Sequence, residues 1–306
     1  MSMPAPRTGR ARERVLTMRG IGKHFGAVKA LSGVDFWVDE GEVVALVGDN
    51  GAGKSTLVKV LSGVHAPDAG TIEFDGEAVE IHTPADAQEL GIATVFQDLA
   101  LCDNLDVVAN LWLGRELVAE GMLDEVGMEE RTWTLLRELS AKVPSVRIPV
   151  ASLSGGQRQT VAIARSLIGD PRVIILDEPT AALGVAQTAE LLNLIERLRE
   201  RGHGVVLISH NMADVMAVAD RVVVLRLGRN NGEYNVADIT SETLIAAITG
   251  ATDITMRQMV QDAARKHPAP LPETVADDTP AGIIRLADGR PKDGRGRRAP
   301  RGRDES

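Results

Sequence analysis

Apolar and polar residues alternate along this chain in patterns that predict both strands and helices. Unbroken apolar runs lie within residues 43–47, 173–178, 205–209 and 222–227. Runs of this kind are typical of strands buried on both faces of a parallel sheet. After the first run, Leu57, Val58 and Leu61 recur at helical spacing, and a further helix carries Leu191, Leu194, Ile195 and Leu198 on one stripe. The order of strand followed by helix predicts an α/β protein.

The segments around the first apolar run predict an antiparallel sheet. Residues 15–18 and 34–38 are strand-like, and residues 71–74 and 77–80 flank the dipeptide Asp75-Gly76. Such a dipeptide between two strand-like runs predicts a β-hairpin.

Three further regions complete the expected organisation. Residues 84–170 are predicted to be mainly helical, forming an inserted helical subdomain over about 86–170 with a small core of its own. A short helix is expected over 241–249. Residues 1–13 and the C-terminal extension 251–306, rich in Pro, Gly, Asp and Arg towards its end, are expected to be largely disordered. One domain over 14–250 remains between them.

Composition narrows the classes of function. The 306 residues carry a formal net charge of −9, which argues against a nucleic-acid partner. The single cysteine, Cys102, excludes an intrachain disulfide and favours a reducing compartment. No apolar run of about 18 residues predicts a membrane span, and the basic N-terminus lacks the apolar core of a signal peptide. We therefore expect a cytoplasmic protein.

A glycine-rich turn links the run at 43–47 to its helix and matches the pattern GxxxxGK[ST]. Gly51 and Gly53 lack a Cβ, so backbone N–H groups can approach phosphate oxygens, and the helix N-terminus adds partial positive charge. Lys54 would reach the β- and γ-phosphates, and the Ser55 hydroxyl would bind Mg²⁺. The residues expected to bind a nucleoside triphosphate here are Gly48, Asp49, Asn50, Gly51, Ala52, Gly53, Lys54, Ser55 and Thr56.

Charged side chains follow two of the buried strands. Asp177 and Glu178 end the run at 173–178, and His210 follows the run at 205–209. The C-terminal ends of parallel strands form the ligand-binding edge of such a sheet. Asp177 would hold Mg²⁺, Glu178 would orient or activate the attacking water, and His210 would contact the γ-phosphate.

Two other features each allow two interpretations. Ser154-Gly155-Gly156 precedes a helix, where it is either an anion site or a plain N-cap formed by Ser154. Phe25, beside Gly26 in an expected loop, is either a core aromatic or an exposed ring that stacks on a base. Residue type alone favours the core.

The motifs come in a characteristic order: GDNGAGKST, Gln97 in VFQD, LSGGQRQ, VIILDEPT, and His210 in LISH. Over roughly residues 14–250 this order resembles the nucleotide-binding subunit of an ATP-binding cassette (ABC) transporter. Within that family, PTAALGVAQT and residues 104–116 are most similar to importers of monosaccharides of the ribose, xylose and fructose type.

The resemblance implies a P-loop NTPase fold with a mostly parallel core sheet, an antiparallel β subdomain and an inserted α-helical subdomain. It implies ATP and Mg²⁺ as cofactors, and Phe25 as the ring that stacks on adenine. The metal ligands would be Ser55, Gln97 and Asp177. The catalytic group would comprise Glu178 as base, His210 as the γ-phosphate switch, Lys54, and Gln97 as sensor. Ser154, Gly155, Gly156 and Gln157 would contact ATP bound to the other protomer.

The implied assembly is a head-to-tail dimer of this chain on the cytoplasmic face of the membrane. It would drive integral membrane permease subunits, supplied indirectly by a solute-binding protein. One departure stands out: Gly184 replaces the Asp that the family usually carries after the Asp-Glu pair. The alternatives are an importer of another solute, such as branched-chain amino acids, a soluble non-transport ABC ATPase, and a cassette that binds ATP without turnover.

Overall fold

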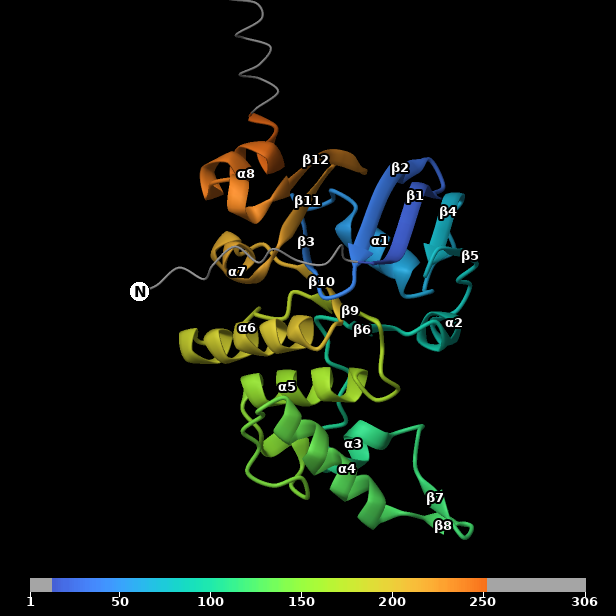
Figure 1. Cartoon of the computed structure of the whole chain (residues 1–306), viewed down its shortest axis with the longest axis vertical. Helices are drawn as coiled ribbons and strands as arrows, with labels where there is room; N and C mark the ends of the chain where they lie inside the picture. Colours follow the sequence, from blue (N-terminus) through green and yellow to red (C-terminus); the bar gives the residue numbers. More distant parts are fainter. Residues whose placement is uncertain (1–12, 252–306) are drawn as a thin grey trace, which may run out of the picture. The chain divides into compact units, whose positions relative to one another are not determined.

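The computed structural model describes residues 13–251 (Figure 1). The disorder expected for residues 1–12 and 252–306 lies outside the described residues. The first twelve elements of the chain are β1 (Arg14–Phe25), β2 (Val28–Asp39), β3 (Val43–Gly48), α1 (Lys54–Leu61), β4 (Ala69–Phe74), β5 (Glu77–Val79), α2 (Pro84–Glu89), β6 (Ile92–Val95), α3 (Val107–Trp112), β7 (Val118–Ala119), β8 (Met122–Leu123) and α4 (Glu125–Glu138). They are followed by η1 (Val150–Ser152), α5 (Gly155–Ser166), β9 (Val173–Asp177), α6 (Val185–Glu200), β10 (Gly204–Ile208), α7 (Met212–Val218), β11 (Arg221–Arg226), β12 (Arg229–Asn235), η2 (Val236–Asp238) and α8 (Ser241–Thr249).

The central sheet has six strands in the order β12-β11-β3-β10-β9-β6. All neighbouring pairs are parallel except β11 and β12, which form an antiparallel edge. The mostly parallel core sheet expected from the apolar runs is therefore confirmed. Because its strands are parallel, the C-terminal ends of β3, β9 and β10 meet at one edge, where the motif residues follow.

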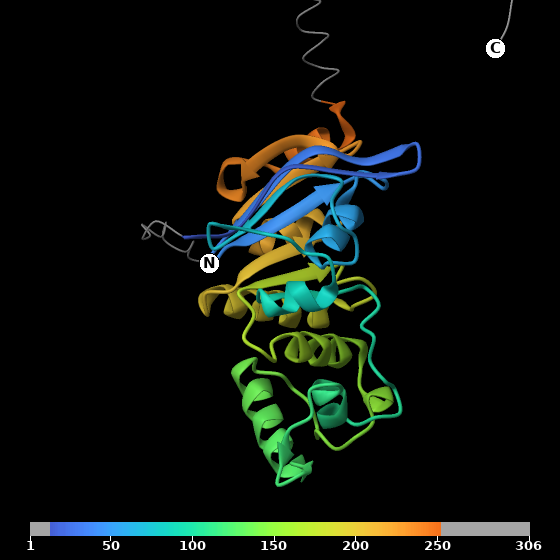
Figure 2. The ribbon, with the colours of Figure 1, turned by 90° about the vertical axis from the view of Figure 1, so that its right-hand side faces the viewer.

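A second sheet is antiparallel, with the order β2-β1-β4-β5. The predicted Asp75-Gly76 hairpin is confirmed: both residues have positive φ, and Phe74 pairs with Glu77 across the turn. The β1–β2 hairpin is longer than residues 15–18 and 34–38 suggested, and it extends past the central strands (Figure 2). Phe25, expected in a loop, ends β1 instead.

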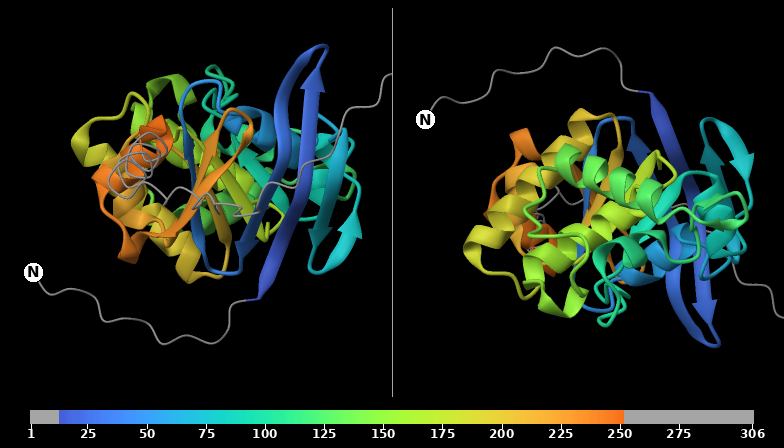
Figure 3. Two further views of the ribbon diagram at one scale, coloured as in Figure 1. Left: turned by 90° about the horizontal axis from the view of Figure 1, so that it is seen from above. Right: turned by 90° about the horizontal axis from the view of Figure 1, so that it is seen from below.

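The central sheet separates two hydrophobic clusters because alternate residues of each strand point to opposite faces. Val43, Ala45 and Val47 of β3 pack with α5, α6, α7 and α8 on one face. Val44 and Leu46 pack with α1 and the antiparallel sheet on the other. Figure 3 shows these two layers on either side of the central strands.

The segment predicted to be mainly helical differs from expectation in two respects. Residues 92–95 form β6, an edge strand of the central sheet, because a four-residue run is too short to show its period. The expected separate core is also wrong. Leu111, Met128 and Leu136 belong to the same cluster as Ile174 and Leu176 of β9. The helices therefore extend the main core.

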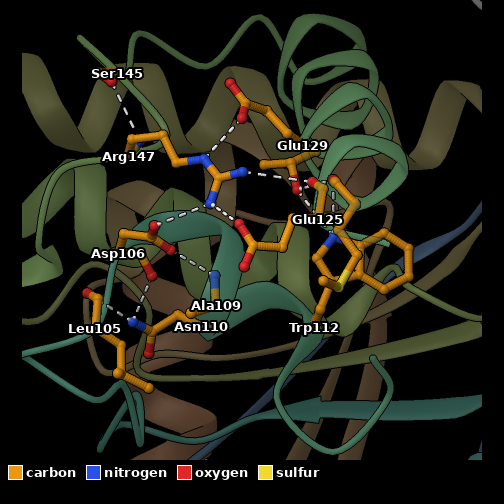
Figure 4. Close-up of polar contacts among 11 residues, drawn as sticks. Leu105, Asp106, Ala109, Asn110, Trp112, Glu125, Glu129, Ser145 and Arg147 are labelled. Carbon is orange, nitrogen blue, oxygen red and sulfur yellow. Dashed lines mark hydrogen bonds and ion pairs between the residues drawn. The ribbon is translucent and has the colours of Figure 1, made fainter. Parts of the chain in front are cut away.

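Arg147 joins α3 and α4 from the segment that precedes η1 (Figure 4). Its Nε donates to Glu129 Oε2 at 2.7 Å, and its Nη1 lies 3.4 Å from Glu125 Oε2 and 3.6 Å from Asp106 Oδ2. The bond to Glu129, followed by the charges of the three carboxylates, raises the pKa of Arg147. Asp106 also caps α3 by accepting from the Ala109 N–H at 2.7 Å. These contacts connect the two helices through polar groups.

Candidate nucleotide-binding site

The glycine-rich loop runs from the end of β3 to the start of α1, as predicted. Gly48 has φ 153° and Gly53 has φ 107°. At Gly53 a Cβ would lie 2.8 Å from Leu31 Cδ2 and 2.9 Å from the Ala30 carbonyl oxygen. At Gly48 a Cβ would meet the carbonyl oxygen of Leu225 in β11. Both positions therefore exclude side chains, which lets the loop pack closely against β2 and β11.

The loop lines an open pocket of about 490 Å³. Lys54 projects over its own loop, and its Nζ donates to the carbonyl oxygens of Gly48 at 2.6 Å and Asp49 at 3.1 Å. Ser55 and Thr56 occupy the first turn of α1. The pocket is lined by Val28, Lys29 and Ala30 of β2, residues 50–56, Leu227 and Gly228.

The β2 residues and the turn after β11 were missed by sequence reasoning. Val28, Lys29, Leu227 and Gly228 carry no motif, and they reach the pocket only because β2 and β11 pack beside the loop. The one signal in the sequence is that Lys29 lies four residues after Phe25, which the family resemblance selects as the ring that stacks on adenine.

Asp177 ends β9, directly opposite Ile208 of β10. Burial, followed by the charge of Glu178, raises the pKa of the Asp177 carboxyl, while Lys54 and Lys59 lower it. Lys54 therefore acts electrostatically on Asp177 although 123 positions separate them in sequence. The fold brings the phosphate loop and the carboxylates together, as predicted.

Glu178 and His210 form a hydrogen-bonded pair at the same edge. His210 Nδ1 lies 2.7 Å from Glu178 Oε2, and the Glu178 N–H donates to the Ile208 carbonyl oxygen at 2.9 Å. The Glu178 side chain is 17% exposed and that of His210 is 76% exposed. Glu178 has φ 50°, a left-handed conformation that is unfavourable for a non-glycine residue. Since Nδ1 is used, a ligand would meet His210 through Nε2.

Ser154 caps helix α5, so the plain N-cap interpretation describes its local role. The Gln157 N–H donates to Ser154 Oγ at 3.3 Å, and the Ser154 N–H donates to Gln157 Oε1 at 2.9 Å. Gln157 Nε2 also donates to the Lys142 carbonyl oxygen at 2.8 Å. Ser154 and Gly155 are exposed, and no residue of 154–157 lines the phosphate-loop pocket. The structure thus does not bring this loop to the site of its own chain.

Three other selected residues lie on the surface. Gln97 is exposed just after β6. Phe25 is 46% exposed and packs against His65, which decides against a core role for its ring. Gly184 precedes α6 as its N-cap residue, and its N–H donates to Gln187 Oε1 at 3.2 Å.

A strand, a phosphate loop and a helix, with a carboxylate at the same edge of the sheet at the end of β9, one strand beyond β10, define the P-loop class of nucleotide-binding proteins. The ABC transporter family model matches residues 31–181. The chain belongs to the ABC transporter family, as an ATP-hydrolysing nucleotide-binding component.

Curated relatives agree with this assignment. The xylose/arabinose import ATP-binding protein XylG of Sulfolobus acidocaldarius is 45% identical over 231 residues, covering 74% of this chain and 92% of the relative. The fructose import ATP-binding protein FrcA of Rhizobium meliloti is 43% identical over 251 residues, covering 79% and 96%. The ribose import ATP-binding protein RbsA 1 of Rubrobacter xylanophilus is 45% identical, but the match covers only 47% of its length.

Solved structures show the same fold. The ADP conformation of MJ1267, an ATP-binding cassette of an ABC transporter, aligns with a TM-score of 0.66 at 27% identity, covering 77% of this chain and 95% of that one. The dimeric structure of MJ0796, a bacterial ABC transporter cassette, aligns with a TM-score of 0.63 at 26% identity, covering 72% and 98%.

Proposed function

We propose that this chain is the energy-coupling subunit of an importer, driving uptake of a small sugar through a separate membrane permease. The main support is the relatives that match over more than nine-tenths of their own length, which are named for import of xylose, arabinose and fructose. Within residues 13–251 no helix has the length and hydropathy to span a bilayer. By analogy with the named import systems, a permease would supply the transport path, with this chain held peripherally on its cytoplasmic face.

Hydrolysis is assigned to the edge of the sheet at which Lys54 follows β3, Glu178 follows β9 and His210 follows β10. Lys54 would exchange its carbonyl partners for phosphate oxygens. Glu178 would accept a proton from the attacking water as the new P–O bond forms and the bond between the γ-phosphorus and the bridging oxygen breaks, releasing ADP. His210, held through Nδ1 by Glu178, would contact the γ-phosphate through Nε2. The three groups then surround the charge that develops in the transition state.

Mg²⁺ would be held by Asp177, the Ser55 hydroxyl and the Gln97 amide. Across residues 13–251 no three His, Cys, Asp or Glu side chains gather into a metal site. Hydroxyl, amide and phosphate oxygens, which Mg²⁺ accepts as ligands, would complete the coordination. The position of Asp177 supports this assignment, because it ends β9 at the edge of the sheet where the phosphate loop follows β3. A cation bound there would stabilise the ionised carboxyl against the burial that raises its pKa. Bound Mg²⁺ would neutralise charge on the phosphates.

The active unit would be a head-to-tail dimer, in which Ser154, Gly155, Gly156 and Gln157 of one chain face ATP on the other. Two observations support it: the 154–157 loop, exposed at Ser154 and Gly155, does not line the pocket of its own chain, and the MJ0796 cassette is dimeric. Gly155 and Gly156 would leave backbone amides open to phosphate oxygens.

The permease would dock in a groove of about 410 Å³ beside Gln97, lined in part by Phe96, Asp98, Leu113 and Arg115. Arg165 of α5 borders the same groove and donates to the carbonyl oxygens of Leu99 and Ala100, each at 2.7 Å. One helix thus carries the 154–157 loop at its start and holds the segment after Gln97 near its end. The movement that closes the dimer would be transmitted along α5 to the permease.

Hydrolysis by the purified chain, measured against protein concentration beside Lys54→Ala, tests the shared-site mechanism. Specific activity should rise with concentration and vanish in the variant. ATP binding with no turnover, alone and with permease added, would contradict the proposal and favour a cassette that does not hydrolyse ATP.

The substrate class is tested in vesicles that contain the chain, its permease and its solute-binding protein. ATP-dependent uptake of xylose, ribose or fructose, lost with Lys54→Ala, is the expected result. Uptake of leucine but of no sugar would replace the sugar assignment with that of an amino-acid importer.

A further inference from the structure

We infer that His65 is a positioning residue for the nucleotide base, holding the Phe25 ring in the orientation that a purine stacks on. This inference rests on the proposed stacking of adenine on Phe25. No motif selects His65, which lies in the segment between α1 and β4.

The segment 65–68 is tied to the end of β1. Asp68 donates from its N–H to the Gly22 carbonyl oxygen at 2.9 Å. Its carboxylate accepts from the His24 N–H at 2.7 Å and from Lys23 Nζ at 2.9 Å. The bond from Lys23, followed by that from His24, lowers the pKa of Asp68. These bonds fix the segment relative to the strand that carries Phe25.

His65 meets Phe25 edge to face, with ring centroids 5.2 Å apart and an interplanar angle of 68°. This is a favourable geometry for two aromatic rings. The His65 N–H donates to the Lys59 carbonyl oxygen at 3.0 Å, in the last turn of α1. His65 therefore links the Phe25 ring to the helix whose N-terminus forms the phosphate loop.

Strand register places Phe25 beside the pocket. Phe25 pairs with Val28, which lines the phosphate-loop pocket, and cross-strand partners project to the same face. Phe25 remains 46% exposed while in contact with His65, so part of its ring is open to a ligand. A ring fixed before binding loses less side-chain entropy when the base stacks on it.

The test compares the affinities of the full-length chain for ATP and for tripolyphosphate, a ligand without a base, by titration calorimetry. His65→Ala should weaken ATP binding roughly two- to fivefold and leave tripolyphosphate binding unchanged, because only the base loses its platform. His65→Phe, which keeps an aromatic ring, should restore the affinity for ATP. His82→Ala is the matched control, since His82 bonds to Glu80 away from the pocket and its side chain is 64% exposed.

Phe25→Ala separates this inference from the proposed function. In the Phe25→Ala background, His65→Ala should have no further effect on ATP affinity. If Phe25→Ala weakens ATP binding but His65→Ala does not, the role of His65 is overturned and stacking on Phe25 stands. Equal weakening for both ligands also overturns it, as the sign of a general structural defect. If Phe25→Ala leaves ATP affinity unchanged, the stacking assignment itself is wrong.

Discussion

Gly48 ends β3 at a point where the chain leaves no room for a side chain. A Cβ there would collide with the carbonyl oxygen of Leu225 in the adjacent strand. Gly51 also has positive φ, but beyond its own chain neighbours no atom lies within 4 Å of the place its Cβ would take. At Gly48 a side chain has no room, whereas at Gly51 only the left-handed backbone conformation disfavours one.

Gly48→Ala should lower the free energy of unfolding by about 2–4 kcal/mol, because either β3 or β11 must shift. Gly51→Ala, which adds only the cost of the left-handed conformation, should lower it by about 1–2 kcal/mol. Urea unfolding of both variants measures the difference. Equal losses would mean that the contact with Leu225 relaxes freely.

The position of Asp177 lowers the stability of the folded chain when its carboxyl is ionised. Burial, followed by the charge of Glu178, raises its pKa, so the folded chain binds this proton more tightly than the unfolded chain does. By linkage, ionisation of Asp177 destabilises the fold once the pH exceeds the pKa in the unfolded chain.

Asp177→Asn should therefore raise the melting temperature of the nucleotide-free chain at neutral pH by roughly 1–3 °C. The gain should disappear as the pH falls below the unfolded pKa of aspartate, because the wild-type carboxyl is then also neutral. Hydrolysis should be lost at every pH. Calorimetric scans across pH, with Glu77→Gln in the exposed strand β5 as control, measure the effect. If the melting temperature of Asp177→Asn stayed higher than that of the wild type in acid, ionisation of Asp177 would not be the cause of the difference.

Among the elements, α3 depends on a buried amide (Figure 4). Asn110 is fully buried, and its Nδ2 donates to the carbonyl oxygens of Cys102 at 3.0 Å, Leu105 at 3.1 Å and Asp106 at 2.9 Å. Its Oδ1 accepts from the Cys102 N–H at 2.7 Å. One side chain thus holds the loop that leads from Gln97 into α3.

Asn110→Ala should lower the free energy of unfolding by about 2–4 kcal/mol, because a buried side chain is removed, the Cys102 N–H loses its acceptor, and the carbonyl oxygens of Cys102, Leu105 and Asp106 each keep only a backbone donor. Asn193→Ala, at an exposed position of α6, should change it by less than about 0.5 kcal/mol. Denaturant titrations compare the two. A small loss at Asn110 would indicate that water replaces the amide.

Sequence patterns predicted the elements whose residues repeat with a clear period. Apolar runs located β3, β9, β10 and β11, and the Asp75-Gly76 turn located its hairpin. β6 was missed because four residues carry too little pattern. The outer halves of β1 and β2 were missed because residues such as His24 and Lys29, which pair with each other there, are exposed. Their strand form comes from pairing and not from burial.

The same distinction holds for the site. Lys54, Asp177, Glu178 and His210 were predictable because each follows a recognisable strand within a motif. Lys29 in the pocket and His65 beside Phe25 were not, because only the folding of distant segments against one another brings them there. The sequence also does not show that the helices of residues 84–170 share the main core. Periodicity identifies the apolar face of a helix but not the element that packs against it.

At the scale of the whole molecule, the pocket and the 154–157 loop lie on different parts of one chain. A head-to-tail dimer would combine the pocket of one copy with the loop of the other. Each shared site thus has two parts that can be damaged separately. Lys54→Ala damages the pocket, and Ser154→Asp damages the loop. Asp is as good an N-cap as Ser, so α5 should keep its start while the added charge repels phosphate.

Each variant alone should be inactive, and mixing equal amounts should restore about a quarter of wild-type activity, since half of the dimers are mixed and each has one intact site. ATP hydrolysis of the mixture, against each variant at the same total concentration, measures the effect. No recovery, despite mixed dimers detected with two different tags, would contradict independent shared sites.

The separation of pocket and loop also has a genetic consequence. A copy with a damaged 154–157 loop keeps an intact pocket of its own, yet it would disable the pocket of any normal copy with which it assembles. The loop of the normal copy would in turn complete the pocket of the damaged copy, so each mixed dimer would keep one working site. Such an allele would not lower activity below that of the normal gene product alone, and the phenotype would follow the number of copies that carry an intact loop.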